Sequence, residues 1–192
     1  MSTPPVRRPA DARIPGSIAG FKAFGVPVRF HFTFLLILVF VVVVGLESEQ
    51  STYSDIAFIG ALFGSVLLHE LGHAIVARRL GVRTLEIVMF PIGGVARIEK
   101  TPPARQELWI AAAGPLVNIV IGVAILLGVA LFGDAPLAGI ETLAAPSDAD
   151  LLERIAFANL ILALFNLLPA FPMDGGRILR SLLAIWKPEG QA

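Results

Sequence analysis

The chain has 192 residues, of which 56% are apolar and 16% charged, and its 15 basic residues balance its 15 acidic ones. An ordinary soluble domain carries about 25% charged residues, so this composition excludes a disordered chain and disfavours a soluble one. Because the chain has no cysteine, disulfide frameworks, thiol catalysis and cysteine-rich metal sites are excluded, and its zero net charge gives no reason to expect nucleic acid as a partner.

The chain contains four long apolar segments, at residues 30–46, 56–77, 108–133 and 155–173. A transmembrane helix needs about 20 predominantly apolar residues, so each segment predicts a span, the first and fourth being the shorter. Pro169 and Pro172 are expected to end the fourth span near Leu168. A signal peptide is the alternative for the first segment, but no small-residue cleavage site follows it.

The basic residues indicate how these spans are oriented. Fourteen of the 15 basic residues lie before the first span, between the second and third, or after the fourth, and Arg154 is the exception. Because cytoplasmic loops are enriched in lysine and arginine, both termini are predicted to be cytoplasmic. The expected location is the cell membrane.

Residues 82–100, between the second and third spans, alternate in polarity around a turn at residues 91–94 and predict a β-hairpin. We therefore predict an α-helical polytopic membrane protein with four transmembrane helices, a small cytoplasmic-side β-hairpin or sheet and a short C-terminal helix. Residues 28–187 form the membrane-embedded domain. Residues 1–27 are expected to be a flexible basic tail, and residues 188–192 a short second tail.

The second predicted span contains the candidate metal-binding and catalytic residues. His69, Glu70 and His73 form an H-E-x-x-H pattern, in which the two histidines are one turn apart on the same helix face and can converge on one metal ion. Glu70 flanks that face and suits a general base. Ionisable side chains inside a span are costly, so these three favour a functional site over a cluster that merely reaches interfacial water. At 1.5 Å per residue, the site lies about 8 to 13 Å from the cytoplasmic end of the helix.

A catalytic zinc needs a third protein ligand and an open position for water. Asp174 is favoured, because it follows a span that two prolines break, and irregular backbone at membrane depth is tolerated only where it is buried in protein or lines a cavity. Asp174 could instead simply cap the following helix. The other candidates on the same side of the membrane are His31, Glu86, Glu99 and Glu107.

Small residues indicate where spans pack closely. Gly60 and Gly64 form a G-x-x-x-G pattern on the second span, with Gly72 further along the same face, and Gly114, Asn118 and Gly122 recur every fourth residue on the third. Asn118 is expected to point inward, either as plain packing or as part of the site.

Two motifs resemble those of the site-2 protease family of intramembrane zinc metalloproteases. Residues 69–73 match the zinc-binding helix of that family, and residues 166–175 match its N-x-x-P-x-x-P-x-D-G motif. The resemblance implies one Zn²⁺ per chain, held by His69, His73 and Asp174, with Glu70 as the general base. Two weaker features agree with the family, Gly93-Gly94-Val95 in the hairpin and Ala113-Gly114-Pro115 with Asn118 on the third span. Gly93, Gly94, Asn118 and Asn166 are expected to support the substrate.

The resemblance also implies an activity, which is cleavage of a substrate helix within the bilayer from the cytoplasmic side. The expected partners are a transmembrane substrate protein and the lipid bilayer. The sequence resembles the compact type without a PDZ-like domain, and it is expected to be short at the C-terminus, where such proteins usually continue through further spans. Two alternatives remain: a membrane transporter of metal ions, and an inactive relative that binds a helix without cutting it.

Overall fold

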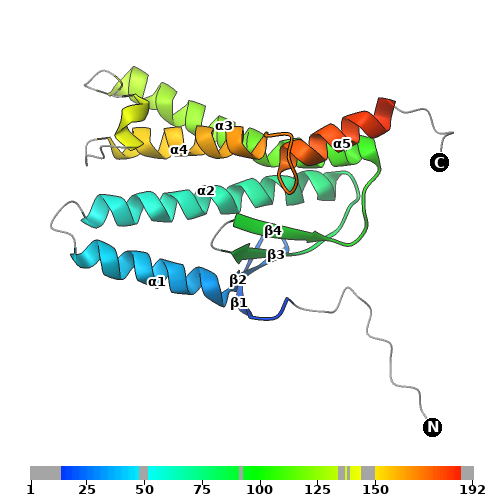
Figure 1. Cartoon of the computed structure of the whole chain (residues 1–192), viewed down its shortest axis with the longest axis horizontal. Coiled ribbons are helices and arrows are strands. Elements are labelled where there is room, and N and C mark those ends of the chain that lie inside the picture. The colour runs from blue at the N-terminus through cyan, green and yellow to red at the C-terminus, as the bar shows by residue number, and fades with distance from the viewer. Residues whose placement is uncertain are drawn as a thin grey trace, which may run out of the picture.

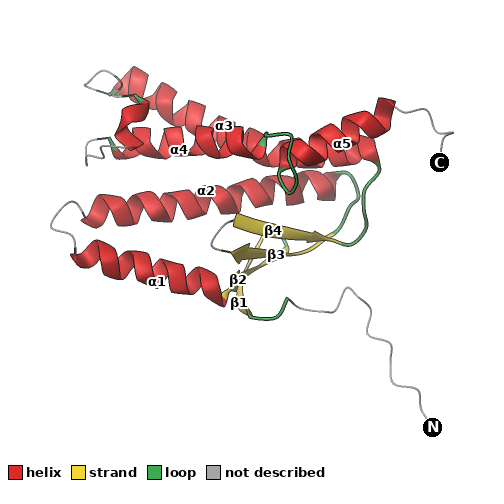
Figure 2. Cartoon of the chain, viewed as in Figure 1, coloured by secondary structure: helices red, strands yellow, loops and turns green. Residues whose placement is uncertain are grey.

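The computed structural model of the chain describes residues 14–47, 52–90, 93–133, 137, 139–143 and 150–186 (Figure 1). Within these ranges the chain is mostly helical, with one small sheet (Figure 2). The elements in chain order are β1 (Ser17–Ala23), β2 (Val26–His31), α1 (Phe32–Glu47), α2 (Thr52–Arg79), β3 (Thr84–Phe90), β4 (Gly93–Ile98), α3 (Ala104–Phe132), the 3-10 turn η2 (Ile140–Leu143), α4 (Leu151–Asn166) and α5 (Asp174–Trp186). Residues 1–13 and 188–192, which belong to the predicted tails, lie outside the described residues.

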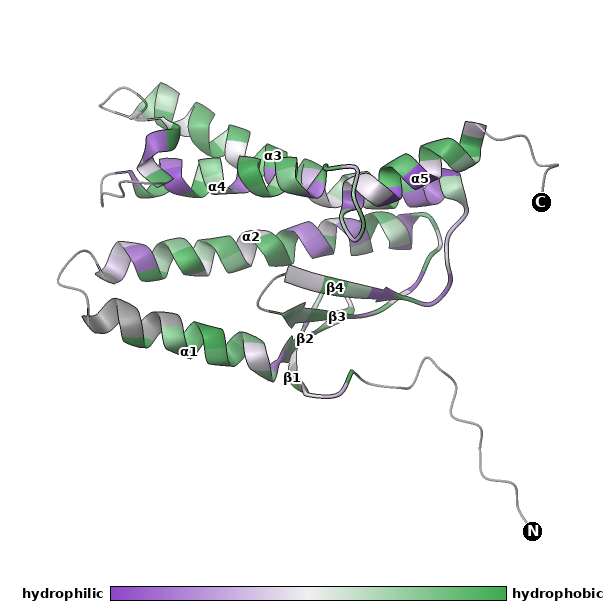
Figure 3. Ribbon diagram, viewed as in Figure 1, coloured by the Kyte–Doolittle hydropathy of each residue, from purple (hydrophilic) through white to green (hydrophobic). Residues whose placement is uncertain are grey.

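The long helices run side by side, with α2 between α1 and the α3–α4 pair (Figure 1). Hydrophobic residues dominate α1 and α3, whereas α2 has a polar stretch where it approaches the sheet (Figure 3). Among the described residues, α2 over Tyr53–Arg79 and α3 are long and apolar enough to cross a membrane. The structure therefore supports two of the four predicted spans.

The first and fourth predicted spans are shorter helices than the apolar segments suggested. Helices α1 and α4 have 16 residues each, below the roughly 20 that a span normally needs. Phe30 and His31 belong to strand β2, so α1 starts only at Phe32. Helix α4 ends at Asn166, ahead of the two prolines. Hydropathy does not distinguish a helix from a strand, and this is why the first apolar segment included two strand residues. The end of α4 at Asn166 is two residues before the end near Leu168 that the prolines predicted.

Glycines allow close contact between helices at two of the predicted positions. A Cβ atom at Gly72 would lie 2.8 Å from a side chain of α3, and one at Gly122 would lie 2.9 Å from a carbonyl oxygen of α4. The prediction for Gly60 and Gly64 was wrong, because a Cβ atom built at either residue meets no described atom beyond its own helix within 4 Å. The close packing surface of α2 lies nearer its Arg79 end, and G-x-x-x-G spacing alone does not show which turn meets a neighbour.

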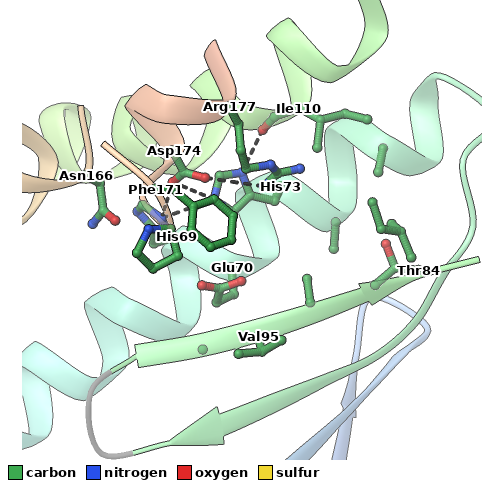
Figure 4. A pocket seen from close by; sticks show the side chains of 16 residues that line it. His69, Glu70, His73, Thr84, Val95, Ile110, Asn166, Phe171, Asp174 and Arg177 are labelled. Carbon is green, nitrogen blue, oxygen red and sulfur yellow. Dashed lines mark hydrogen bonds and ion pairs between the residues drawn. The ribbon is translucent and has the colours of Figure 1, made fainter. Parts of the chain in front are cut away.

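The sheet has the strand order β1-β2-β3-β4, with β2 and β3 parallel and the outer pairs antiparallel. The predicted hairpin is confirmed as β3 and β4. Val28, Ile87 and Met89 of the sheet form a hydrophobic core with Leu71 and Ala74 of α2. Strand β4 is therefore at an edge of the sheet, and its unpaired side lies next to α2 (Figure 4).

Residues 17–27 are not the flexible tail that was predicted for residues 1–27. They form β1 and the start of β2, with Ala23 paired to Val26. Gly20 allows the two strands to approach, since a Cβ atom there would lie 2.4 Å from the Val28 carbonyl oxygen. The sequence signal was weak because β1 contains small residues with no clear alternation. The parallel pairing of β2 with β3 is also a contact between distant segments, which local patterns do not report.

Candidate metal centre and cleft

Three potential ligand atoms converge from α2 and the start of α5 (Figure 4). Nε2 of His69 and Nε2 of His73 lie 3.1 Å apart, and each lies 3.1 Å from Oδ2 of Asp174. All three residues are buried. The structure therefore brings together the three residues that were predicted as zinc ligands.

This triangle of atoms fits a zinc ion. Ligand atoms bound tetrahedrally to zinc at about 2.0–2.1 Å lie about 3.3 Å from one another, close to the 3.1 Å spacing here. His73 donates its Nδ1–H to the Ile110 carbonyl oxygen at 2.6 Å, so its Nε2 lone pair faces the other two ligand atoms. Two imidazoles and one carboxylate also leave the fourth position that a catalytic zinc needs for water.

Glu70 lies beside the triangle of ligand atoms. A carboxylate oxygen of Glu70 lies within 4.8 Å of an imidazole nitrogen of His69 and of His73, and the residue is buried. Its side chain extends toward strand β4 (Figure 4). A Cβ atom at Gly94 in that strand would lie 2.2 Å from Cγ of Glu70, so only glycine leaves room for the carboxylate in this position.

Helix α3 leaves space for the two imidazoles because it has no side chain where it meets them. A Cβ atom at Gly114 would lie 2.3 Å from Nε2 of His73 and 2.6 Å from Nε2 of His69. This contact gives a steric reason for glycine in the Ala113-Gly114-Pro115 segment that resembles the family. It also explains why α3 can lie against the proposed ligands.

Asp174 is the first residue of α5 and follows an irregular segment, residues 167–173. A Cβ atom at Gly175 would lie 2.2 Å from a carbonyl oxygen of that segment, and one at Gly176 would lie 2.6 Å from another. The two glycines thus let the first turn of α5 pack directly against the segment's backbone. The Asp174 carboxylate faces the histidines through Oδ2, and its Oδ1 lies 3.4 Å from Nη1 of Arg177. Its side chain therefore belongs to the site, even though the residue begins a helix.

A cleft runs past Glu70, between β4 on one side and the end of α4 with the following segment on the other. It consists of two adjoining cavities of about 350 Å³ and 250 Å³ that share His69, Glu70 and Gly94. The first is lined by polar groups that include Thr84 and Arg177. The lining of the second includes the apolar side chains of Val66, Leu162 and Phe165.

The predicted substrate-supporting residues differ in their relation to this cleft. Asn166 and Gly94 line both cavities, and Gly93 lines the second. Asn118 lines neither. It is fully buried, and neither its amide nitrogen nor its amide oxygen has a hydrogen-bond partner among the described residues.

The structure places the four other candidate ligands away from the triangle of ligand atoms. Glu99 is exposed after the end of β4. The remaining three have other partners: His31 contacts Thr33 at 2.7 Å, Glu86 accepts from Arg97 at 2.6 Å, and Glu107 pairs with Arg177 and Arg180.

Sequence reasoning did not identify some polar residues near the site. Asn159 of α4 donates to Oγ of Ser65, which lies one turn of α2 before His69. Far from the site, at the Thr52 end of α2, Arg154, the exception among the basic residues, pairs with Asp55 at 2.8 Å. A polar residue within an apolar segment was the available signal for Asn159, but its partner on another helix could not be read from the sequence.

Comparison with known proteins agrees with this site. The sequence pattern of peptidase family M50 matches residues 57–149 and 140–191. A zinc metalloprotease of Methanocaldococcus jannaschii is 46% identical over 169 residues, which cover 88% of this chain and 46% of that protein. Stage IV sporulation protein FB of Bacillus subtilis is 32% identical over 116 residues, covering 59% of this chain and 36% of that protein.

A solved structure is also similar. The site-2 protease from Methanocaldococcus jannaschii superposes with a TM-score of 0.68 at 42% identity, covering 90% of this chain and 74% of that one. The chain spans less than half the length of the two curated relatives described above. Both motifs, at residues 69–73 and 166–175, fall within the matched part of the family pattern. The chain therefore belongs to peptidase family M50, the family of the site-2 proteases.

Proposed function

We propose that this chain is a zinc-dependent intramembrane protease that hydrolyses a peptide bond in or near a transmembrane helix of a substrate protein. The observation that carries this proposal is the position of Glu70. Its carboxylate lies beside the converging ligand atoms of His69, His73 and Asp174, and all four residues line the larger cavity of the cleft. A base next to a metal site in a buried cleft is what metal-assisted peptide hydrolysis requires.

Each site residue has a separate role in the proposed reaction. His69, His73 and Asp174 hold the metal. When bound, zinc activates water for attack and polarises the scissile carbonyl group. Glu70 accepts the proton that the attacking water loses and delivers it to the nitrogen of the departing amine.

The cleft suits a substrate in an extended conformation. A peptide bond within a helix is protected by helical hydrogen bonds, so the substrate must unwind locally before it is cut. Strand β4 offers an edge beside Glu70, and pairing with that edge would satisfy the backbone groups that unwinding exposes. Gly93 and Gly94 leave the start of that edge without side chains, and Asn166 lies on the opposite wall of the cleft.

The orientation of the chain is part of the same proposal. The four apolar segments support four spans, and the basic residues support cytoplasmic termini, since 14 of 15 lie before the first span, between the second and third, or after the fourth. Arg154 is compatible with this arrangement because Asp55 pairs with it and its guanidinium lies 4.6 Å from the centre of the Phe58 ring. The cleft would then open toward the cytoplasm in the cell membrane.

Asn118 is not given a substrate-binding role in this proposal, because it lies outside the cleft. The polar contact between Ser65 and Asn159 lies one turn from His69, and it is the feature that would serve the alternative, a transporter of metal ions. A protease needs Glu70 to accept a proton from water, whereas a transport site needs no such proton acceptor. Replacement of Glu70 by glutamine therefore separates the two functions.

The experiment that tests the proposal compares cells that carry the intact gene with cells that carry Glu70→Gln. Membrane proteins whose fragments accumulate only with the intact gene are the expected substrates. Identical fragment patterns in the two strains would contradict a protease role. A zinc-accumulation measurement on the same cells tests the transporter alternative.

A further inference from the structure

The first turns of α3 contact the metal centre from outside α2 and α5. The Ile110 carbonyl oxygen accepts a hydrogen bond from Nδ1 of His73. One turn earlier, the buried carboxylate of Glu107 lies 3.6 Å from Nε of Arg177 and also contacts Arg180. Helix α3 thus touches His73 directly and reaches Asp174 through an arginine.

The three charged residues of α5 in this network share one face of that helix. Asp174, Arg177 and Arg180 recur every third residue, and residues at this spacing are neighbours on a helix surface. Both arginines contact the single carboxylate of Glu107. Because a buried carboxylate without a partner is strongly disfavoured, Glu107 fixes how this face of α5 is placed on α3.

The two oxygens of Asp174 have different partners as a result. Oδ2 lies 3.1 Å from both histidine Nε2 atoms, whereas Oδ1 lies 3.4 Å from Nη1 of Arg177. Arg177 in turn lies against Glu107. The orientation of the Asp174 carboxylate therefore depends on an ion pair that involves neither histidine.

We propose that Glu107, acting through Arg177, is a positioning residue that directs Oδ2 of Asp174 toward the two histidines and thereby sets the zinc affinity of the site. This inference rests on the ligand set of the proposed function. Groups that orient a metal ligand commonly change metal affinity by about 10- to 100-fold when they are removed. The consequence is measurable without any substrate.

The chain offers a matched control for a merely structural effect. Glu86 is also buried, and it lies 2.6 Å from an arginine of β4 and 3.7 Å from one of β2. Like Glu107, it is one carboxylate between two arginines, but both of its partners belong to the sheet, whereas those of Glu107 belong to α5. Glu86→Gln and Glu107→Gln therefore remove the same charge from similar surroundings, and only the second should disturb the ligand.

The test measures the zinc dissociation constant of the full chain in detergent by competition with a chromogenic chelator. Glu107→Gln and Arg177→Gln should each weaken zinc binding by about 10- to 100-fold, and Glu86→Gln should leave it unchanged. Because the two residues act in series, the double variant should bind zinc as weakly as the weaker single variant, and no more weakly. Arg177 is partly exposed, so Arg177→Gln remains informative if Glu107→Gln does not fold.

Two results would overturn the inference. One is wild-type zinc affinity in folded Glu107→Gln or Arg177→Gln, and the other is an equal loss in Glu86→Gln. Asp174→Ala, measured alongside, distinguishes this failure from that of the ligand set. If Asp174→Ala loses zinc while the two other variants keep it, only the positioning role fails; if Asp174→Ala binds zinc normally, the ligand assignment fails as well.

Discussion

Gly114 of α3 lies directly against the His73 imidazole, since a Cβ atom at this glycine would be only 2.3 Å from Nε2. At this position, helix α3 therefore contacts the two proposed histidine ligands through its backbone and not through a side chain. This contact ties the metal centre to helix packing, because the position of α3 decides how much room the two imidazoles have.

Gly114→Ala is expected to weaken zinc binding by displacing one or both imidazoles, by about 10- to 100-fold, the range seen when ligand orientation is lost. Zinc titration of the purified variant measures the effect. Gly60→Ala is the matched control, because it makes the same change on a helix at a position with no described atom beyond its own helix within 4 Å. Normal zinc affinity in Gly114→Ala would show that the helices separate easily and that the contact does not constrain the site.

Gly94→Ala is expected to impair the reaction while leaving zinc in place. Its new methyl group would lie 2.2 Å from Cγ of Glu70, so the carboxylate must move, whereas the histidines are not displaced. A shift of about 1 Å in a catalytic group can cost roughly 10²-fold in rate. Turnover of an identified substrate at full zinc occupancy checks this. Gly128→Ala is the control, because a Cβ atom built at Gly128 in α3 meets no described atom beyond its own helix within 4 Å. Unchanged turnover would argue against the present position of Glu70.

Asp174→Ala is expected to lower the zinc content of the purified protein well below one ion per chain, because two histidines alone are an incomplete protein ligand set. Elemental analysis after purification measures it. His31→Ala and Glu86→Gln should keep their zinc, since both side chains lie in the sheet with other partners. Full zinc in Asp174→Ala would assign the third position to another residue.

Much of this site could be predicted because its signals are local. The i, i+4 spacing of His69 and His73 places both imidazoles on one helix face, and the prolines after Asn166 mark the break after which Asp174 lies next to them. The steric roles of Gly94 and Gly114 could not be derived in this way. Both depend on which helix or strand lies opposite, and that is decided by packing between distant segments.

The same limit explains the errors in the fold. Strand β1 has no clear alternation of its own and is positioned by its pairing with β2. Strand β2 pairs in turn with β3, which follows it in the sequence only after helices α1 and α2. Gly60 and Gly64 have the spacing of a helix contact but no partner within reach among the described residues. Spacing reports what an element could contact, whereas the contact itself depends on the whole fold.

The orientation of the chain can be tested with single cysteines, since the natural sequence has none. Lys100 and Glu141 are both exposed, and they are predicted to lie on opposite sides of the membrane. In intact cells, an impermeant thiol reagent should modify Glu141→Cys, and it should modify Lys100→Cys only after the membrane is opened. The reverse pattern would contradict the proposed topology.

The most direct test of the central claim is peptide-bond cleavage by purified wild-type protein and by Glu70→Gln at equal zinc occupancy. The substrate is a transmembrane protein identified by the comparison in cells. Glutamine keeps the size of the side chain and leaves the histidines intact but cannot accept the proton. We therefore expect zinc binding to persist and the cleavage rate to fall by about 10²- to 10⁴-fold. Equal cleavage by both forms would contradict the account, as would zinc transport by the wild-type protein without any cleavage.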